Sequence, residues 1–437
     1  MASAYLERTA TSGNQKTATF SGWFKKCSNG VEQVFYHMRT DSSNFFRIRW
    51  DSNDILNGAS RVSGTDYYVT ATRKFRDTSA YYHIVFKVDT TQATASDRLK
   101  LYVNGEEVTV SASNYPAQNL DLQMNVNSMA QRVGQENGGN YFDGLMTHIH
   151  WTDGNAYDAS DFGETDSTSG IWKPKTSPSV TYGSNGFFLK MENSGAMGTD
   201  SSGNTNTFTV SGTLTQTEDT PSNNFATLNP LIQSGVGTLT NGNLTHSSSS
   251  GIKHIISSFG ITKGKWYAEA KYTGGGNYNG VGFVSEPILP TTTAWYNSPY
   301  AAILTYTNVY NNGSGLGTYA TPSTNDIIGI AVDADNGFIY FSNNGTFGNS
   351  GVPTSGATGT GGIATSVFSG NTNTIFFASE QDATPGTRSA EWNFGNGYFG
   401  TTAVASSNSD SAGLGLFEYS VPSGYYALCT KNIKNYG

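Results

Sequence analysis

The sequence has few charged residues, and this scarcity excludes several classes of protein. Charged residues make up 13% of the 437 positions, and the formal net charge is −8. A disordered chain needs high net charge and few aromatic residues, so disorder is not expected. Binding to nucleic acid or to an anionic membrane needs a basic patch, and the short basic cluster at residues 73–76 is followed at once by Asp77. We expect neither nucleic acid nor a membrane as a partner.

Cysteines and long apolar runs are also scarce. Cys27 and Cys429 stand near opposite ends of the chain, so we predict two buried thiols in different domains rather than a disulfide framework. No window approaches the ~18 consecutive apolar residues of a membrane-spanning helix. The first residues lack the apolar core of a secretory signal. We expect synthesis in a cytoplasm without an export signal.

Glycine and aromatic residues, by contrast, are abundant. The chain contains 51 Gly, 25 Tyr and 24 Phe. Many short strands joined by tight turns need this combination. The length favours two domains. The sequence therefore predicts an all-β protein with two antiparallel β-sandwich (jelly-roll) domains in tandem.

The first half of the chain shows strand and hairpin patterns. Residues 82–88 alternate apolar and polar positions with a period of two, which is typical of a half-buried strand. Asn104 and Gly105 separate two further apolar runs, at 99–103 and 108–110. Asn-Gly between two such runs is a strong hairpin signal, because a type I′ turn needs positive φ at both central residues.

The second half repeats these patterns after a polar connector. Residues 265–272 alternate, and the runs 327–333 and 338–342 flank a turn at 335–337. The connector contains turn-rich polar stretches but also Trp172, which a free tether would lack. We expect a first domain at 1–162, an ordered, partly extended connector at 163–230, and a second domain at 231–437.

Particular motifs resemble known families. The segments FSGWF, YHIVF, LYVNG and FDGL resemble concanavalin A-like, laminin-G-type jelly rolls, and they begin at residues 20, 82, 101 and 142. The segments GKWYAE, GVGF, DIIGIAVD and WNFG resemble a SPRY domain, and they begin at 264, 280, 326 and 392. Together with the connector sequence at 219–230, the arrangement resembles virion proteins of tailed bacteriophages, including tail fibres. The resemblance implies two sandwiches with loops at their ends and a binding role, often toward glycans.

Aromatic and amide residues in two loops of the second domain are candidates for ligand binding. Aromatic rings with neighbouring amides suit sugar stacking and protein recognition. The alternative is that Trp295 and Tyr300 pack inward and cap the sandwich. The candidate ligand-binding residues are Asn277, Tyr278, Trp295, Tyr296 and Tyr300.

Acidic clusters provide candidates for calcium and for catalysis. Asp51, Asn53 and Asp54 form an oxygen-rich loop, the type of ligand set that Ca²⁺ prefers, and calcium at this loop is left open; no other cofactor is expected. Glu164 and Asp166 are the nearest match to a glycosidase carboxylate pair, but the third carboxylate of the jelly-roll hydrolase pattern is absent. We expect no catalytic residues and no enzymatic activity.

We therefore expect a non-catalytic structural protein of a phage virion. Its loops would bind host-surface glycan if it is a tail fibre or appendage, and multivalency would then favour a homo-oligomer, with a trimer as the guess. The alternative is a capsid decoration or tail-structural protein whose partners are other virion proteins. A polysaccharide-degrading enzyme is the third hypothesis, distinguished by release of reducing ends. The expected location is the virion in each structural case.

Overall fold

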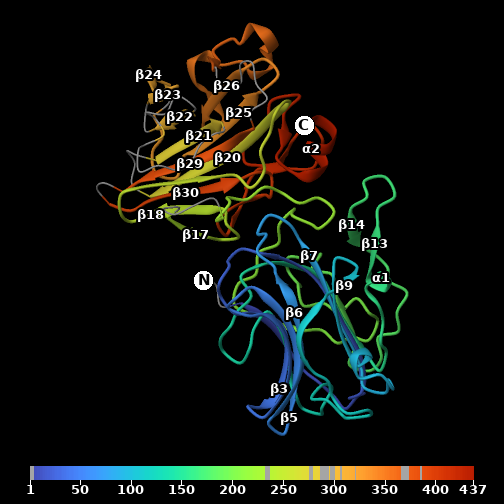
Figure 1. Cartoon of the computed structure of the whole chain (residues 1–437). Helices are drawn as coiled ribbons and strands as arrows, with labels where there is room; N and C mark the ends of the chain where they lie inside the picture. The colour runs from blue at the N-terminus through green and yellow to red at the C-terminus, as the bar shows by residue number, and fades with distance from the viewer. Residues whose placement is uncertain are drawn as a thin grey trace. The chain divides into compact units, whose positions relative to one another are not determined.

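The chain divides into two compact units. A computed structural model describes residues 4–231, 237–274, 279–285, 295, 301–305, 308–319, 321–365, 374–383 and 386–437. Unit 1 is Met1–Gln216 and unit 2 is Thr217–Gly437 (Figure 1). Within these residues the protein is almost entirely β, with strands in antiparallel sheets, which confirms the predicted fold class. None of the described helices is long and apolar enough to cross a membrane.

Unit 1 contains two main sheets. Over the described residues, the eight-stranded sheet has the order β10 (Val110–Asn114), β6 (Thr65–Lys74), β5 (Ile55–Val62), β4 (Asn44–Trp50), β3 (Gln33–Asp41), β11 (Ala130–Val133), β1 (Tyr5–Thr9) and β16 (Thr209–Ser211). The six-stranded sheet has the order β15 (Phe187–Leu189), β12 (Gly144–Asp153), β2 (Thr17–Lys26), β7 (Tyr82–Asp89), β8 (Leu99–Val103) and β9 (Glu106–Glu107). A small hairpin of β13 (Gly163–Thr165) and β14 (Trp172–Pro174), the helix α1 (Ala159–Phe162) and a 3₁₀ turn at Ala95–Asp97 complete the unit.

The core of unit 1 lies between these two sheets and follows from the period of two. On β7, Ile84, Phe86 and Val88 are buried in one cluster, as the alternation predicted. Strands β3 and β4 add Tyr36 and Ile48 from the facing sheet. Burial of aromatic and branched side chains from two facing sheets is what stabilises a β-sandwich.

The hairpin predicted at residues 104–105 is present, but its second strand was placed too far along the chain. Asn104 and Gly105 have φ of 52° and 89°, as a type I′ turn requires. β8 pairs with β9, which is only Glu106–Glu107. The chain then crosses to the other sheet, where β10 pairs with β6. Val108 still continues the hairpin, because its N–H donates to Leu101 O at 2.9 Å, whereas Val110 begins the edge strand of the eight-stranded sheet.

Unit 2 is a second sandwich. Its larger sheet follows, over the described residues, the path β17 (Thr238–Thr240), β18 (Thr245–Ser248), β30 (Arg388–Asn393), β20 (Lys265–Gly274), β25 (Ile327–Asp333), β26 (Phe338–Asn343) and β27 (Thr346–Phe347), with β28 (Ile363–Ala364) on β26 and β35 (Tyr426–Ala427) on β20. Its smaller sheet is β19 (Ile252–Ile256), β29 (Ile375–Asp382), β21 (Asn279–Ser285), β22 (Ala301–Thr305), β23 (Asn308–Asn311) and β24 (Ser314–Thr318). Short pairs β31 (Tyr398–Phe399) with β32 (Thr402–Ala403) and β33 (Asn408–Ser409) with β34 (Leu416–Phe417), the helix α2 (Thr430–Tyr436), and 3₁₀ turns at Gly348–Ser350 and Pro353–Thr358 follow.

The predicted hairpin of unit 2 and the predicted thiol burial are confirmed. β25 and β26 pair from Asp333 opposite Phe338, which closes the turn at residues 335–337. The buried Asp333 carboxylate accepts hydrogen bonds from Asn336 and lies 2.9 Å from Lys265 Nζ. Cys27 and Cys429 are both buried, one in each unit.

The segment that the sequence marked as a connector is shared between the units rather than separate from them. β15 and β16 extend the two sheets of unit 1 by pairing with β12 and β1. Residues from Thr217 onward belong to unit 2, and Phe225, Ala226 and Leu228 are fully buried there. Phe187 and Phe208 of this segment belong to the core of unit 1, whereas Trp172, which argued against a free tether, is half-buried and packs on His83.

Candidate functional site

The outer face of the eight-stranded sheet carries polar side chains from strands far apart in the sequence. Because Leu6, Val133, Tyr36 and Ile48 point into the core, their strand neighbours point outward. Strand pairing aligns the outward residues in two adjacent rows. The first row is Glu7, Arg132, His37, Arg47, Ala59, Tyr68 and Asn114, and the second is Thr9, Ala130, Arg39, Phe45, Arg61 and Asp66. We call these rows, together with Arg49, the outer face.

Arginines are concentrated on this surface. The chain contains ten arginines, and five of them lie on the outer face: Arg39, Arg47, Arg49, Arg61 and Arg132. A guanidinium group offers five N–H donors in a planar fork, which suits recognition of carboxylates and of ligands rich in oxygen. A sheet face with several guanidinium groups therefore offers many hydrogen-bond donors to a polar ligand.

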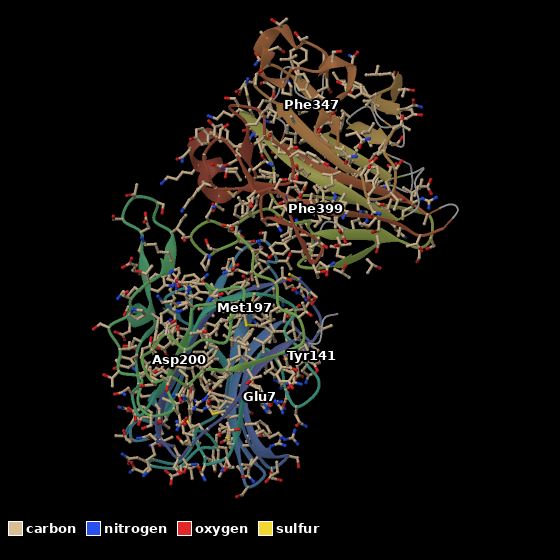
Figure 2. All side chains as sticks on the ribbon, turned by 180° about the vertical axis from the view of Figure 1, so that it is seen from behind. Glu7, Tyr141, Met197, Asp200, Phe347 and Phe399 are labelled. Atoms are coloured by element: carbon tan, nitrogen blue, oxygen red, sulfur yellow. The ribbon has the colours of Figure 1, made fainter. Side chains whose placement is uncertain are left out.

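Most of these arginines are paired with carboxylates. Arg61 binds Asp66 through two bonds, of 2.7 and 2.6 Å. Arg47 Nη1 lies 3.2 Å from Glu136. Two further pairs join Arg132 to Glu7 and Arg49 to Glu32. Figure 2 labels Glu7, at one end of the first row, and Tyr141, whose ring lies 6.3 Å from that of Tyr5 on the same strand as Glu7.

An aromatic ring fixes two of the guanidinium groups. The Cζ atoms of Arg47 and Arg61 each lie 5.0 Å from the centroid of the Phe45 ring. Attraction between a cation and a ring face restrains both side chains. The centre of the outer face is therefore an ordered group of side chains rather than a set of mobile surface arginines.

Burial and charge together set the ionisation of the groups at the centre. His37 is 1% exposed, and burial lowers its pKa to about 4, with Glu136 opposing the shift and Arg39, Arg47 and Arg132 adding to it. Burial alone would raise the pKa of Glu136, but Arg47 and His37 outweigh it and hold that pKa below its usual range. At neutral pH the histidine is neutral and the glutamate is ionised.

Two carboxylates meet at the edge of the outer face. Asn140 Nδ2 donates to Glu32 Oε1 at 3.1 Å and to Glu136 Oε2 at 3.2 Å. A retaining glycosidase also places two carboxyl groups close together, but one of them must be protonated to act as the acid. Arg47 lies near both carboxylates, and the lowered pKa of Glu136 keeps it ionised. The pair is suited to accepting hydrogen bonds, not to donating a proton.

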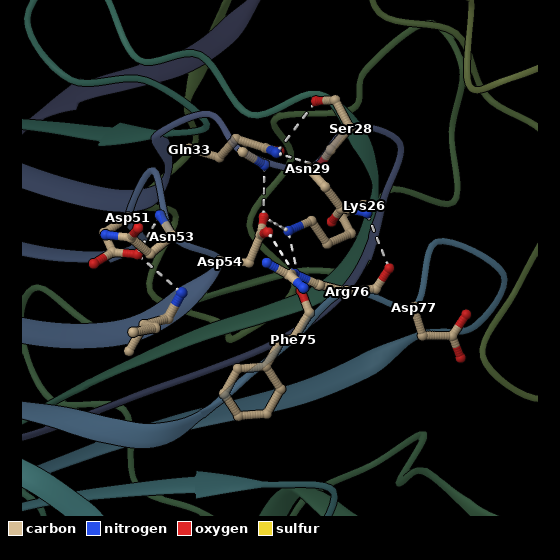
Figure 3. Close-up of polar contacts among 12 residues, drawn as sticks. Lys26, Ser28, Asn29, Gln33, Asp51, Asn53, Asp54, Phe75, Arg76 and Asp77 are labelled. Carbon is tan, nitrogen blue, oxygen red and sulfur yellow. Dashed lines mark hydrogen bonds and ion pairs between the residues drawn. The ribbon is translucent and has the colours of Figure 1, made fainter. Parts of the chain in front are cut away.

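The loop considered for calcium is occupied by a buried ion pair and a turn (Figure 3). The Asp54 carboxylate contacts Lys26 Nζ at 2.8 Å and Arg76 Nε at 3.3 Å, and it accepts the Gly30 N–H. Burial would raise the pKa of Asp54, but the hydrogen bond from Lys26 and the other donors lower it.

The other two residues of this loop close a turn. Asp51 Oδ1 accepts the backbone N–H groups of Asn53 and Ile55 at 2.8 and 2.9 Å. Among the described residues, no group of three His, Cys, Asp or Glu side chains could hold a metal ion. Oδ1 of Asp51 and both carboxylate oxygens of Asp54 thus have partners within the protein, and these contacts give the loop a structural role.

Only one of the aromatic-loop candidates lies within the described residues. Trp295 is 2% exposed, its ring stacks on His254 with centroids 4.4 Å apart, and its backbone N–H donates to Glu380. The alternative that Trp295 packs inward therefore describes this residue. Asn277, Tyr278, Tyr296 and Tyr300 lie outside the described residues.

The pair considered for catalysis lies in the hairpin of β13 and β14. Lys173 Nζ is 2.9 Å from Asp166 and 3.6 Å from Glu164. The hydrogen bond from Lys173, with those from Ser169, lowers the pKa of Asp166 well below its usual range. Both carboxylates share one cation in a turn, which is the arrangement of a structural hairpin rather than of a general acid.

The comparisons with known proteins concern parts of the chain. Residues 2–156, about a third of the sequence, match the family model of the concanavalin A-like lectin/glucanases superfamily. Unit 1 thus resembles that superfamily in sequence and has a lectin-like β-sandwich fold. No match was found among curated proteins.

Solved structures similar to parts of the chain include three β-rich proteins. The SPRY domain of human HERC1 has 16% identity, with 38% of this chain and 96% of that chain covered and a TM-score of 0.28. A SAP-like pentraxin from Limulus polyphemus has 15% identity, with 36% and 73% covered and a TM-score of 0.29. Domain 4 of the arabinanase AbnA from Geobacillus stearothermophilus, solved with arabinotriose, has 20% identity, with 34% and 65% covered and a TM-score of 0.27.

The candidate residues named from the sequence do not include the outer face, although one signal for it exists. On β4, Arg47 and Arg49 alternate with Ile48 and Trp50, a pattern that predicts a charged face opposite an apolar one. The other charged residues of the first row, Glu7 and Arg132 among them, come from strands whose order a single sequence does not give.

Proposed function

We propose that this protein is a non-catalytic component of a phage virion that binds host-surface glycan through the outer face of unit 1. The observation that carries the proposal is the alignment of guanidinium, carboxylate, amide and phenol groups in two rows across one sheet. The match of residues 2–156 to a superfamily of lectins and glucanases supports a carbohydrate ligand. The sequence resemblance to tailed-bacteriophage proteins supports the virion.

The chemistry of the outer face suits a sugar. Hydroxyl groups both donate and accept hydrogen bonds, so they can bridge the arginines and the carboxylates of Glu32 and Glu136 without breaking charge balance. Tyr68 is half-buried on β6 and supplies a ring against which the apolar face of a sugar can pack. Because its neighbour across the sheet is Ala59, the ring stands beside a small side chain.

Catalysis is not part of the proposal. Hydrolysis at the outer face or in the hairpin of β13 and β14 would need one carboxyl group there with a raised pKa, whereas Glu136 and Asp166 both have a lowered pKa. Binding without turnover suits an appendage that must hold its receptor. Several copies, for which we keep the guess of a trimer, would raise the avidity of a weak site.

A glycan microarray with the purified chain tests this proposal. We expect binding to a set of bacterial surface glycans, and we expect Tyr68→Ala to weaken it by about tenfold, the loss of roughly one stacking contact. Tyr102→Ala is the matched control, because Tyr102 is also half-buried but lies on β8 of the other sheet. Equal losses in the two variants, or no bound glycan, would contradict a site on the outer face.

Mass spectrometry of purified virions tests the location. The protein should be present in the particle, and cryo-electron microscopy should place it at the tail periphery. A position on the capsid or between tail proteins would favour the second candidate, a decoration or tail-structural protein that contacts other virion proteins.

A further inference from the structure

One arginine of the outer face differs from the other four. Arg47, Arg49, Arg61 and Arg132 each form an ion pair with a carboxylate, whereas Arg39 forms none with any described residue. Glu7, Glu32, Asp66 and Glu136 occupy the other four guanidinium groups, so the fork of N–H donors on Arg39 is the one that no ion pair among the described residues uses. Arg39 is half-buried, so part of its hydration has been lost without replacement.

The residues around Arg39 leave one side of it open. Ala130 lies directly opposite on β11, and Thr9 follows on β1. On the other side Arg39 faces Phe45, whose ring is already held between Arg47 and Arg61. The side chains of Ala130 and Thr9 are small, so they leave space beside Arg39 in the second row.

The titratable groups near Arg39 form no ion pair with it among the described residues. His37, two residues away on the same face, has a pKa of about 4 and is neutral at pH 7. Asp41 lies on the same side of β3, and hydrogen bonds from Asn44 and Ser43, with a smaller effect of the Arg39 charge, lower the pKa of its carboxyl group. Asp66 and Glu136 on the same face are held by Arg61 and Arg47.

We propose that Arg39 binds the oxyanion of an acidic sugar, a carboxylate or a sulfate ester, so that the outer face selects acidic over neutral glycans. This inference rests on the proposed function. An oxyanion would accept two parallel hydrogen bonds from the guanidinium fork, and the sugar ring would lie over Ala130 and Thr9. Charge-assisted, bidentate bonds of this kind are stronger and more directional than bonds between neutral groups.

The experiment uses the full chain and a microarray that presents each acidic glycan beside its carboxyl-reduced or desulfated counterpart. Wild type should bind acidic glycans at least about tenfold more tightly than their neutral counterparts, the factor expected for one charge-assisted pair. Arg39→Gln should remove this preference, and Arg39→Lys should retain part of it, because lysine keeps the charge but not the fork. Separate carboxylated and sulfated members show which oxyanion is recognised.

Arg73→Gln is the matched control. Arg73 also forms no ion pair among the described residues, but it lies at the far end of β6, where its guanidinium packs over Phe75. It should leave the preference unchanged, and unchanged melting temperatures should show that both variants fold.

The outcomes separate this inference from the proposed function. Binding of neutral and acidic glycans with equal affinity, still weakened by Tyr68→Ala, would overturn the role of Arg39 and keep the glycan site. Equal effects of Arg39→Gln and Arg73→Gln would show a general charge effect and overturn the inference as well. If no glycan binds, both proposals fail.

Discussion

The two sheets of unit 1 differ in what contacts the side of each sheet that points away from the core. The side of the six-stranded sheet away from the core is contacted by other segments of the same unit: Trp172 Nε1 donates to His83 Nδ1 at 3.0 Å, and the Tyr182 ring stacks on His150 with ring centroids 6.1 Å apart. The outer face of the eight-stranded sheet instead carries half-buried charged groups that are paired with one another. We call the first the covered face.

On the covered face, polar side chains form hydrogen bonds with other side chains of the same unit. Because His83 Nδ1 accepts the Trp172 N–H, its proton sits on Nε2, which contacts Ser21 Oγ at 2.8 Å. Burial lowers the pKa of His83 to about 3. This Ser–His pair therefore has no acceptor nitrogen left for the serine proton, and its role is structural.

The two faces differ in whether their polar side chains have partners among the described residues of unit 1. On the covered face the His83 ring packs against the rings of Trp23 and Trp172, with centroids 4.6 and 6.0 Å apart. On the outer face the ion pairs are complete except at Arg39. A polar group that loses water without gaining a partner is costly, and for this reason we propose a ligand at the half-buried Arg39.

Removing a buried ring from the covered face should have the largest effect on stability. Phe188 is buried on β15 and packs against His150 and His148. Phe188→Ala should lower the unfolding free energy of unit 1 by about 3 kcal/mol, through lost burial and the cavity that remains. Calorimetry of the full chain, in which the two units are expected to give separate transitions, measures the change.

Tyr68→Ala on the outer face is the control for this prediction. Its side chain is only half-buried, so we expect a loss below about 1 kcal/mol. Equal losses for Phe188→Ala and Tyr68→Ala would show that the two faces do not differ in the way we describe.

Acid should distinguish the two faces next. On the covered face burial lowers the pKa of His83 to about 3, that of His148 to about 4, and that of His150 well below its usual range. On the outer face only His37 behaves in this way among the described residues. In each case the unfolded chain binds the proton more readily, so stability is full above pH ~6.5 and falls as the pH falls toward the folded-state pKa.

Urea unfolding between pH 7 and pH 5 tests this ordering. His83→Gln should flatten the decline in the stability of unit 1, since glutamine is neutral and can still hydrogen-bond Ser21. His37→Gln also removes one titrating group, so it should flatten the decline by a similar amount, and most of the remaining decline should come from the other two histidines of the covered face, His148 and His150. A larger flattening in His37→Gln combined with none in His83→Gln would reverse the assignment.

Local patterns in the sequence were sufficient for much of the fold. Alternation placed Ile84, Phe86 and Val88 in the core, and the turn chemistry of Asn104 and Gly105 located a hairpin, because both depend on neighbours in the chain. The predicted partner run at 108–110 is divided between the two sheets, because Val108 still bonds to Leu101 of β8 whereas Val110 pairs with β6. That choice depends on packing far along the chain.

The candidate site was less accessible to sequence reasoning. Trp295 looked like a ligand contact because aromatic loops often are, and its burial against His254 depends on a strand about forty residues away. The same limit applies to the first row, where Glu7, His37 and Arg132 become neighbours only through strand order. Residue type identifies chemistry, but the sheet decides which chemistry comes together.

The smallest expected effect concerns a single ion pair on the outer face. A double-mutant cycle with Arg47→Met and Glu136→Gln should give a coupling energy of about 1 kcal/mol, near the top of the range for exposed pairs, because both groups are mostly screened from water. Urea unfolding of unit 1 at low and high salt measures it, and salt should weaken it only in part. A coupling of several kcal/mol would mean that the pair is excluded from water like the buried Lys26–Asp54 pair. Arg47 and Glu136 would then not be accessible to a glycan.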